Sequence, residues 1–166
     1  PLGLGSEAGP AEIAARDIDV RPDGQGLPEG SGTVVEGERV YEAHCMRCHG
    51  AFGTDPGWHV IAGGRGSLGT DEPTLTVGSF WPHATTLFDY TRRAMPFDDQ
   101  SLTADELYAV TAYVLHLNDI LPRDAELDAE SLPEVEMPNA DGFIPDPRPD
   151  VEPQAEPPAE PAPTVR

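Results

Sequence analysis

The sequence has no lysine, only two cysteines and few aromatic residues. Its basic residues are all arginines, and Asp and Glu outnumber them 30 to 10, which gives a formal net charge of -20. Nucleic acid and anionic membrane surfaces are therefore poor partners, because like charges repel. No apolar run approaches the roughly 18 residues that a membrane span needs. We therefore predict a chain that neither crosses a membrane nor binds nucleic acid.

Irregular chain is expected to make up much of the molecule. The 166 residues suffice for one domain of ordinary size, but they include 19 prolines and 17 glycines. A small domain with so much irregular structure has little core of its own. A large apolar cofactor would add surface around which such a domain can fold.

The two cysteines belong to one short motif, because residues 45–49 read Cys-Met-Arg-Cys-His. This is the attachment sequence of a c-type haem. One turn of chain brings the thiols of Cys45 and Cys48 to the two vinyl groups of a porphyrin, and the next residue places an imidazole under the iron. We therefore expect one covalent haem c, with His49 as the proximal iron ligand.

Two other interpretations of this motif remain to be weighed. A redox-active disulfide also has Cys-x-x-Cys spacing, but it is typical of a thioredoxin-like βαβ unit and gives His49 no role. A structural zinc site needs four ligands. Cys45, Cys48, His49 and His44 are too crowded on one turn to surround an ion tetrahedrally, and no second Cys or His pair stands at finger spacing.

A helix is predicted on the N-terminal side of the motif, over residues 34–44. Ser31 or Thr33 can cap it, and acidic residues fall in its first turn, where the helix dipole favours them. Gly37, Tyr41 and Cys45 share one face of this helix. Glycine in the middle of a helix costs roughly 1 kcal/mol relative to alanine, so we expect another helix to approach closely there.

The clearest helix follows the capping box at residues 103–106, Thr-Ala-Asp-Glu, and is predicted to run to about Asn118. Its apolar stripe has helical spacing, with Tyr113 at the margin. The stripe consists of Leu107, Val110, Val114 and Leu117. We expect this face to pack against the Gly37 and Tyr41 face of the first helix.

Between these helices, residues 50–82 are predicted to loop over the edge of the haem, and a short helix is predicted from Thr85 or Thr86 to residue 93. Proline disfavours a helical residue before it, so this helix must end where Met95 precedes Pro96. Trp58 and Trp81 could border the haem or donate to a propionate, although packing in the core explains them equally well.

Met95 is the favoured sixth ligand of the iron, because its loop can return to the open side of the haem. Several other side chains were considered. They are Met46, His44, His59, His83, His116 and Met137. Met46 and His44 are too close to the attachment turn, and His116 lies outside the apolar stripe of its helix. His59, His83 and Met137 stay open. An iron with both axial positions filled, by His49 and Met95, has no vacant site for a substrate. It would transfer electrons rather than transform a substrate.

The pattern predicts a haem domain over residues 33–122 with an arm on each side. Residues 1–32 are expected to be extended, with at most a turn or two of helix near residues 11–15, and to pack on the chain or on a partner. Residues 123–144 carry scattered apolar groups suited to wrapping a surface. Residues 145–166 are predicted to be an acidic, proline-rich, disordered tail.

With these elements placed, the middle of the chain resembles class I cytochromes c, an all-α fold around one covalent haem. A narrower resemblance extends over roughly residues 11–144. It is carried by EIAARDIDVRPDG at residues 12–24, by GSFWP, LFDY and RRAMPF within residues 78–97, and by VEMPN at residues 135–139. These runs resemble the cytochrome c subunit of the sulfane (sulfur) dehydrogenase of the thiosulfate-oxidising Sox system.

The resemblance implies an electron-accepting subunit that is not catalytic alone. Its partner would be a molybdenum-cofactor subunit, in a heterotetramer of two of each, which oxidises sulfane sulfur on a separate carrier protein; a further cytochrome would take the electrons. Both arms would lie on the molybdenum subunit. Arg92 and Arg93 could meet haem propionates or acidic partner groups, or be ordinary solvated arginines. A one-haem protein and a piece of a longer two-haem protein are both compatible with two cysteines.

Haem is attached to such motifs outside the bacterial cytoplasm, so the resemblance also implies a periplasmic location. The chain begins at Pro1 rather than Met, as expected of a protein whose signal peptide has been removed, or of a fragment. Three alternatives remain. They are a free monohaem carrier, the cytochrome subunit of a related sulfite dehydrogenase and a haem enzyme with an open site.

Overall fold

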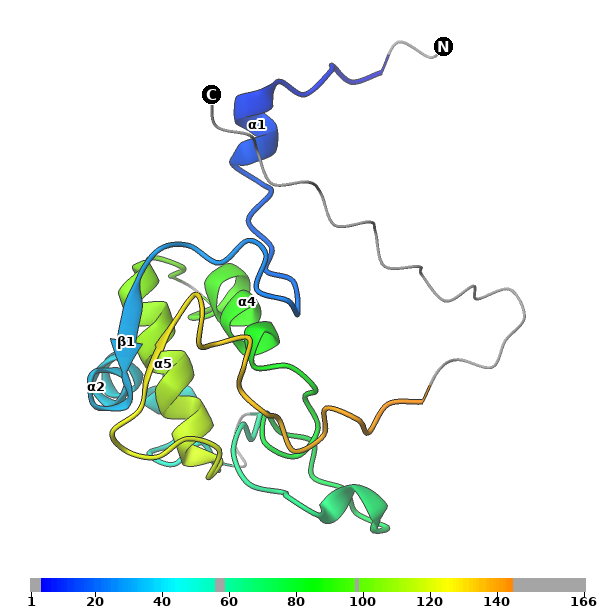
Figure 1. Cartoon of the computed structure of the whole chain (residues 1–166), viewed down its shortest axis with the longest axis vertical. Coiled ribbons are helices and arrows are strands. Elements are labelled where there is room, and N and C mark those ends of the chain that lie inside the picture. Colours follow the sequence, from blue (N-terminus) through cyan, green and yellow to red (C-terminus); the bar gives the residue numbers. More distant parts are fainter. Residues whose placement is uncertain (1–3, 56–58, 98, 145–166) are drawn as a thin grey trace.

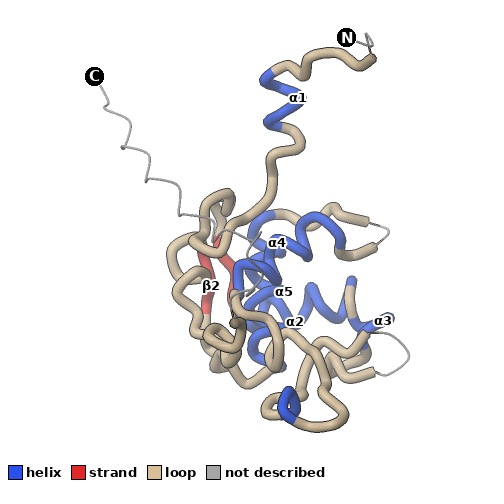
Figure 2. The backbone as a smooth tube through the Cα atoms, turned by 90° about the vertical axis from the view of Figure 1, so that its right-hand side faces the viewer, coloured by secondary structure: helices blue, strands red, loops and turns tan. Residues whose placement is uncertain are grey.

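The structure is a computed structural model that describes residues 4–55, 59–97 and 99–144. It is mostly helical (Figures 1 and 2). The helices are α1 (Pro10–Ala14), α2 (Val34–His44), α3 (Met46–His49), α4 (Ala84–Ala94) and α5 (Ala104–Leu117), with a 3-10 turn, η1, at Ser67–Gly69. Two short strands are present, β1 (Ser31–Thr33) and β2 (Glu126–Asp128). None of the helices in the described ranges is long and apolar enough to cross a membrane.

The capping box predicted at Thr103 is present, and Thr33, one of the two candidate caps of the first helix, forms a second one. Thr33 caps α2: its hydroxyl accepts a hydrogen bond from the backbone N–H of Glu36, whose carboxylate accepts one from the N–H of Thr33. Thr103 and Glu106 form the same reciprocal pair at the start of α5. Each box satisfies N–H groups that a helix terminus leaves without a partner. The predicted bounds of α2 and α5 are therefore confirmed to within a residue.

α2 and α5 pack with their backbones in close contact at Gly37. A Cβ atom built on Gly37 would overlap the carbonyl oxygen of Ala109 and come within 2.8 Å of Cβ of Tyr113. One turn later the rings of Tyr41 and Tyr113 pack with centroids 5.2 Å apart. The predicted close approach is confirmed, but the contact face of α5 is formed by Ala109 and Tyr113. α5 is buried on nearly all sides, so residues of the expected stripe can pack against parts of the chain other than α2.

α4 begins at Ala84, one residue before the expected range. His83 is its N-cap residue and makes no side-chain capping bond, while Thr85 lies inside the helix and is buried. α4 ends at Ala94, and Met95 has extended backbone dihedral angles, as expected of a residue before proline.

The segment after α5 packs on the chain itself. β2 pairs antiparallel with β1, with Ser31 opposite Asp128 and Thr33 opposite Glu126 (Figure 2). Leu127, Leu132 and Met137 are at most 5% exposed and belong to the main core. These three side chains complete the core of this chain, whereas Phe143 and Ile144 at the end of the segment are exposed. The prediction that residues 123–144 wrap a partner therefore stays a prediction for the end of the segment.

The N-terminal arm divides into two parts. Residues 4–17 include α1, which stands away from the other helices in both views, and Ile13 on α1 is 54% exposed (Figures 1 and 2). The part that follows returns to the domain, where Val20 is buried in the core and the Pro28 carbonyl accepts a hydrogen bond from Tyr108. The predicted tail, residues 145–166, lies outside the described residues.

The long loop between α3 and α4 is fastened to the end of α5 by Asn118, which is 5% exposed. Its side-chain oxygen accepts from the N–H of Gly63 at 3.1 Å. Its amide nitrogen donates to the carbonyls of Ile61 and Val114, at 3.2 and 2.9 Å. A Cβ atom at Gly78 would overlap this side chain, so two separate parts of the loop, near Gly63 and at Gly78, contact Asn118.

We expect Gly37→Ala to lower the free energy of unfolding by about 2 kcal/mol, because the added methyl group forces apart two helices whose backbones touch. Alanine has the higher helix propensity, so a propensity effect alone would have the opposite sign. Chemical denaturation of the two proteins measures the difference. Gly69→Ala is the matched control, since its Cβ would meet nothing within 4 Å; an equal loss in both variants would contradict the interpretation.

We expect Asn118→Ala to lower the free energy of unfolding by about 2 kcal/mol, because it removes a buried side chain that bonds the N–H of Gly63 and the carbonyl of Ile61. Denaturant unfolding followed by haem absorbance measures this loss. Gln25→Ala, on the surface of the arm, should stay within about 0.5 kcal/mol of the original protein. A neutral Asn118→Ala would show that the loop is held by other contacts.

Candidate functional site

The attachment motif lies in the single turn α3, between α2 and the long loop. The N–H groups of Cys48 and His49 both donate to the carbonyl of Cys45, at 3.1 and 3.0 Å. Gly50 ends the turn with a φ of 72°, a conformation that favours glycine, and its carbonyl accepts a hydrogen bond of 2.9 Å from Tyr41. The turn is therefore fixed on α2 from both of its ends.

The imidazole of His49 is held in one tautomer. Its Nδ1 atom lies 2.9 Å from the carbonyl oxygen of His59. Since a carbonyl oxygen only accepts, Nδ1 carries the proton and Nε2 has the free lone pair. A backbone carbonyl on the second ring nitrogen is the usual support of an iron-ligating histidine. His49 is thereby prepared to bind a metal through Nε2.

Two adjoining cavities, of about 300 and 250 Å³, open beside His49. Both are lined by Cys45, His49, His59 and Met95. The walls of the larger cavity are mainly apolar and come from the loop, α4 and α5. They include Val60, Ile61, Val77, Trp81, Leu87, Val110 and Val114. Val110 and Val114 belong to the predicted stripe of α5, which therefore faces this space rather than α2.

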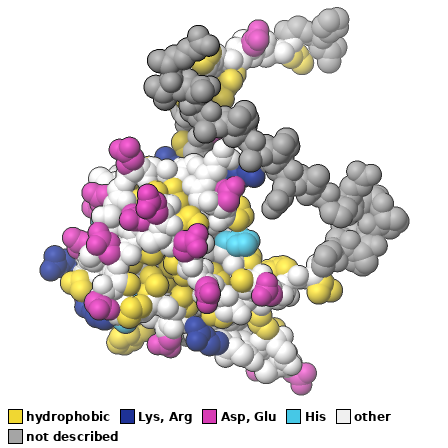
Figure 3. All heavy atoms as spheres, in the orientation of Figure 1, with side chains coloured by type: hydrophobic (Ala, Val, Ile, Leu, Met, Phe, Trp, Pro, Cys, Tyr) yellow, Lys and Arg dark blue, Asp and Glu magenta, His cyan; other side chains and the backbone are white. Residues whose placement is uncertain are grey.

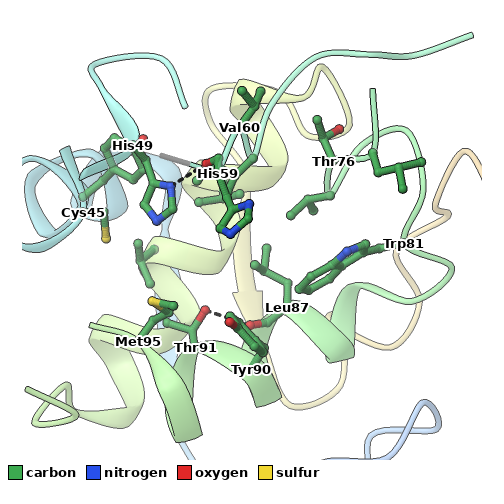
Figure 4. Close-up of a pocket in the computed structure, with 16 residues that line it drawn as sticks. Cys45, His49, His59, Val60, Thr76, Trp81, Leu87, Tyr90, Thr91 and Met95 are labelled. Carbon is green, nitrogen blue, oxygen red and sulfur yellow. Dashed lines mark hydrogen bonds between the residues drawn. The ribbon is translucent and has the colours of Figure 1, made fainter. Parts of the chain in front are cut away.

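Met95 reaches the cavities from the C-terminal end of α4. Its N–H donates to the Thr91 carbonyl at 3.0 Å, so its position follows directly from the last turn of the helix. In Figure 4 its side chain points into the cavity from α4, across from the ring of His49. The structure therefore brings together all four predicted site residues, since Cys48 lines the smaller cavity.

The competing iron ligands are placed less well. Met137 is buried in the core and does not line either cavity. His83 is the N-cap residue of α4, and Nδ1 of His116 is bonded to the Leu121 carbonyl. His59 does line both cavities, but its ring lies beside that of His49 in Figure 4 rather than across the cavity from it.

The Cys45 thiol differs from the reactive thiols of a redox-active pair. Both cysteines are free, and burial raises the pKa of Cys45 to about 11, with a smaller contribution from Cys48. Redox-active and zinc-binding cysteines instead have a lowered pKa, because they react as thiolates. Across the described residues, no group of three or more His, Cys, Asp and Glu side chains is placed to hold a metal ion.

Arg92 and Arg93 do not line either cavity. Arg92 donates to the carbonyls of Ile18 and Gly26 in the N-terminal arm, and Arg93 forms an ion pair with Asp89 on the same helix. Both side chains are therefore engaged by other groups of this chain, and the structure gives no support to the suggestion that they meet propionates. Trp81 does border the larger cavity, edge-on to Tyr90 with centroids 5.9 Å apart. Trp58 lies outside the described residues.

Sequence reasoning missed the His59 carbonyl and Tyr41 as supports of the attachment turn. A backbone carbonyl leaves no signal in the sequence, and the tyrosine was interpreted only as a packing residue. Their contacts complete a site whose parts fit a covalent haem. Two thiols lie one turn apart, an imidazole presents Nε2, a thioether faces it, and mainly apolar side chains line the cavity between them.

Comparison with known proteins agrees with this fit. The sequence model of the family described as cytochrome c oxidase, cbb3-type, subunit III matches residues 32–114, half of the chain. Among solved structures, a chain in the crystal structure of the sulfane dehydrogenase SoxCD from Paracoccus pantotrophus is 42% identical. That match covers 100% of this chain and 85% of the other, with a TM-score of 0.82. A search of curated proteins found no match.

Half of the chain matches a cytochrome family, and all of it aligns with a SoxCD chain at an identity well above the level at which only a fold is shared. The prediction of a class I cytochrome c fold is confirmed, and such a domain implies covalent haem c. The chain therefore belongs to the family of Sox cytochrome c subunits, which are electron-transfer proteins.

Proposed function

We propose that this chain is the electron-accepting subunit of a sulfane dehydrogenase and carries one haem c. Cys45 and Cys48 hold the haem, and His49 and Met95 ligate its iron. The observation that carries the proposal is the placement of Nε2 of His49 and the thioether of Met95 across one apolar cavity that Cys45 also lines. The bound haem supplies one-electron transfer.

The residues of the chain set the conditions for this transfer. The His59 carbonyl keeps the proton on Nδ1 of His49 and makes the ring a better donor. Thioether ligation by Met95, together with the mainly apolar walls of the cavity, favours a high reduction potential. The smaller cavity reaches Pro96 and Phe97, and Phe97 is 85% exposed, so this edge lies next to the protein surface.

The partner in this proposal is a molybdenum-cofactor subunit, in a heterotetramer of two of each. It would oxidise sulfane sulfur on a carrier protein during periplasmic thiosulfate oxidation, and a further cytochrome would take the electrons. The outer ends of both flanking segments expose apolar side chains. This exposure supports a firm contact with the partner. The exposed side chains are Leu4 and Ile13 on one side, and Phe143 and Ile144 on the other.

The charge of the surface agrees with a protein partner. Acidic side chains are spread over the face in Figure 3, and arginines are few. The partner contacts assigned here to residues 4–17 and to the end of the segment 123–144 are apolar. The sequence resemblance implied that both arms lie on the molybdenum subunit along their whole length. The assignment here is narrower, because the inner parts of both arms pack on this chain.

We expect the untagged protein, purified from its native source, to co-elute with molybdenum at about one per haem. The mass of the complex should correspond to two of each subunit, which metal analysis and light scattering on the same fractions would show. Haem without molybdenum would instead favour a free carrier. Carbon monoxide binding by the reduced protein would indicate an open iron site, as in a haem enzyme.

We expect Met95→Leu to remove the weak far-red band of Met-ligated ferric haem and to lower the reduction potential by on the order of 0.1 V, because the thioether no longer closes the iron. Visible spectra and a redox titration measure both changes. Met137→Leu is the matched control and should keep the band. His59→Ala removes the ring but not the carbonyl and should also keep it. A band that persists in Met95→Leu, or that is lost in Met137→Leu, would contradict the assignment of Met95.

A further inference from the structure

α4 has two opposite faces with different contacts. Leu87, Thr91 and Met95 are spaced four residues apart and line the larger cavity. The hydroxyl of Thr91 donates to the Leu87 carbonyl and the N–H of Met95 to the Thr91 carbonyl, so the three residues form one connected row. The position of the Met95 thioether is therefore set by the position of α4.

The other face of α4 binds the arm at residues 18–28. Asp89 is 8% exposed, and its Oδ1 accepts from the N–H of Val20 at 2.8 Å and from Nε of Arg93 at 3.0 Å. Arg92 donates to the carbonyls of Ile18 and Gly26, at 3.0 and 3.3 Å. Asp89 lies about half a helical turn away from the row that lines the cavity, and Arg92 lies about a quarter of a turn away from it.

The arm is also fastened to α5. Val20 is buried in the main core, and the Pro28 carbonyl accepts a hydrogen bond of 2.8 Å from Tyr108, which is on α5. In Figure 1 the arm descends beside α4 before it enters β1. The arm therefore connects the outer face of α4 to α5, while α4 itself lacks the side-chain N-cap that α2 and α5 have.

We infer that the arm at residues 18–28 braces α4 from outside, with Asp89 and Arg92 as positioning residues that hold Met95 on the iron. This inference rests on the proposed role of Met95 as the sixth ligand. With the brace intact, α4 cannot move away from the haem, and the thioether stays at bonding distance. With the brace cut, the ferric protein spends more time with Met95 displaced.

Imidazole binding to the ferric holoprotein tests the brace, because imidazole takes the sixth position only when Met95 has left it. Its apparent affinity rises with the fraction of protein in that state. We expect Asp89→Ala and Arg92→Ala to bind imidazole about tenfold more tightly than the original protein, which corresponds to about 1.4 kcal/mol. Titration of the far-red band gives the dissociation constants.

Two further variants separate positioning from general destabilisation. Asp89→Asn keeps an oxygen that can accept from the Val20 N–H, so its imidazole affinity should return toward the original value. Thr33→Ala removes the N-cap of α2, away from α4, and should lower the thermal midpoint while leaving imidazole affinity within about twofold. If Asp89→Ala fails to take up haem, Arg92→Ala carries the test, since Arg92 bonds only to arm carbonyls among the contacts described above.

The outcomes distinguish this inference from the proposed function. Original protein without a far-red band would overturn both, because Met95 would not be the ligand. A band in the original protein, with unchanged imidazole affinity in Asp89→Ala and Arg92→Ala, would overturn the brace alone. An equal gain in affinity in Thr33→Ala would also overturn it, because general loss of stability would then explain the effect.

Discussion

The contact of the α2 backbone with the α5 backbone is the constraint on which the rest of the structure depends. Only a residue without Cβ fits at Gly37, and its absence of a side chain lets α5 approach closely enough for Tyr41 and Tyr113 to pack. That approach brings Val110 and Val114 to the cavity that begins at Cys45, at the end of α2. A wider spacing would move one wall of the site away from its attachment point.

The parts that the sequence predicted are those with short-range signals. The haem motif, the N-cap of α2, the capping box at Thr103 and the end of α4 before Pro96 each depend on neighbours within a few residues. Gly37 also gave a local signal, because glycine inside a helix lowers its stability. This cost indicated that another helix approaches α2 closely at Gly37. The chemistry of the site was predictable for the same reason, because two thiols and an imidazole on one turn allow few uses.

The parts that escaped prediction join residues far apart in the chain. The pairing of Ser31 with Asp128, the bonds of Asn118 to the loop and those of Arg92 to the arm involve neither periodicity nor spacing. Leu127 and Leu132 were interpreted as partner contacts because their segment is acidic and has no pattern of its own. Their burial depends on the shape of a core that only the folded chain defines.

The pairing of β1 with β2 has a consequence for how the haem domain is built into larger proteins. Because β1 directly precedes α2 and β2 follows α5, the stretch of residues 31–128 begins and ends at one place. Such a unit can be inserted into another chain, or opened at a new site and rejoined at its original ends, without separating the helices that enclose the cavity. The chain before β1 and the chain after β2 leave this edge side by side, and both then pack on the core, the first through Val20 and the second through Leu132 and Met137.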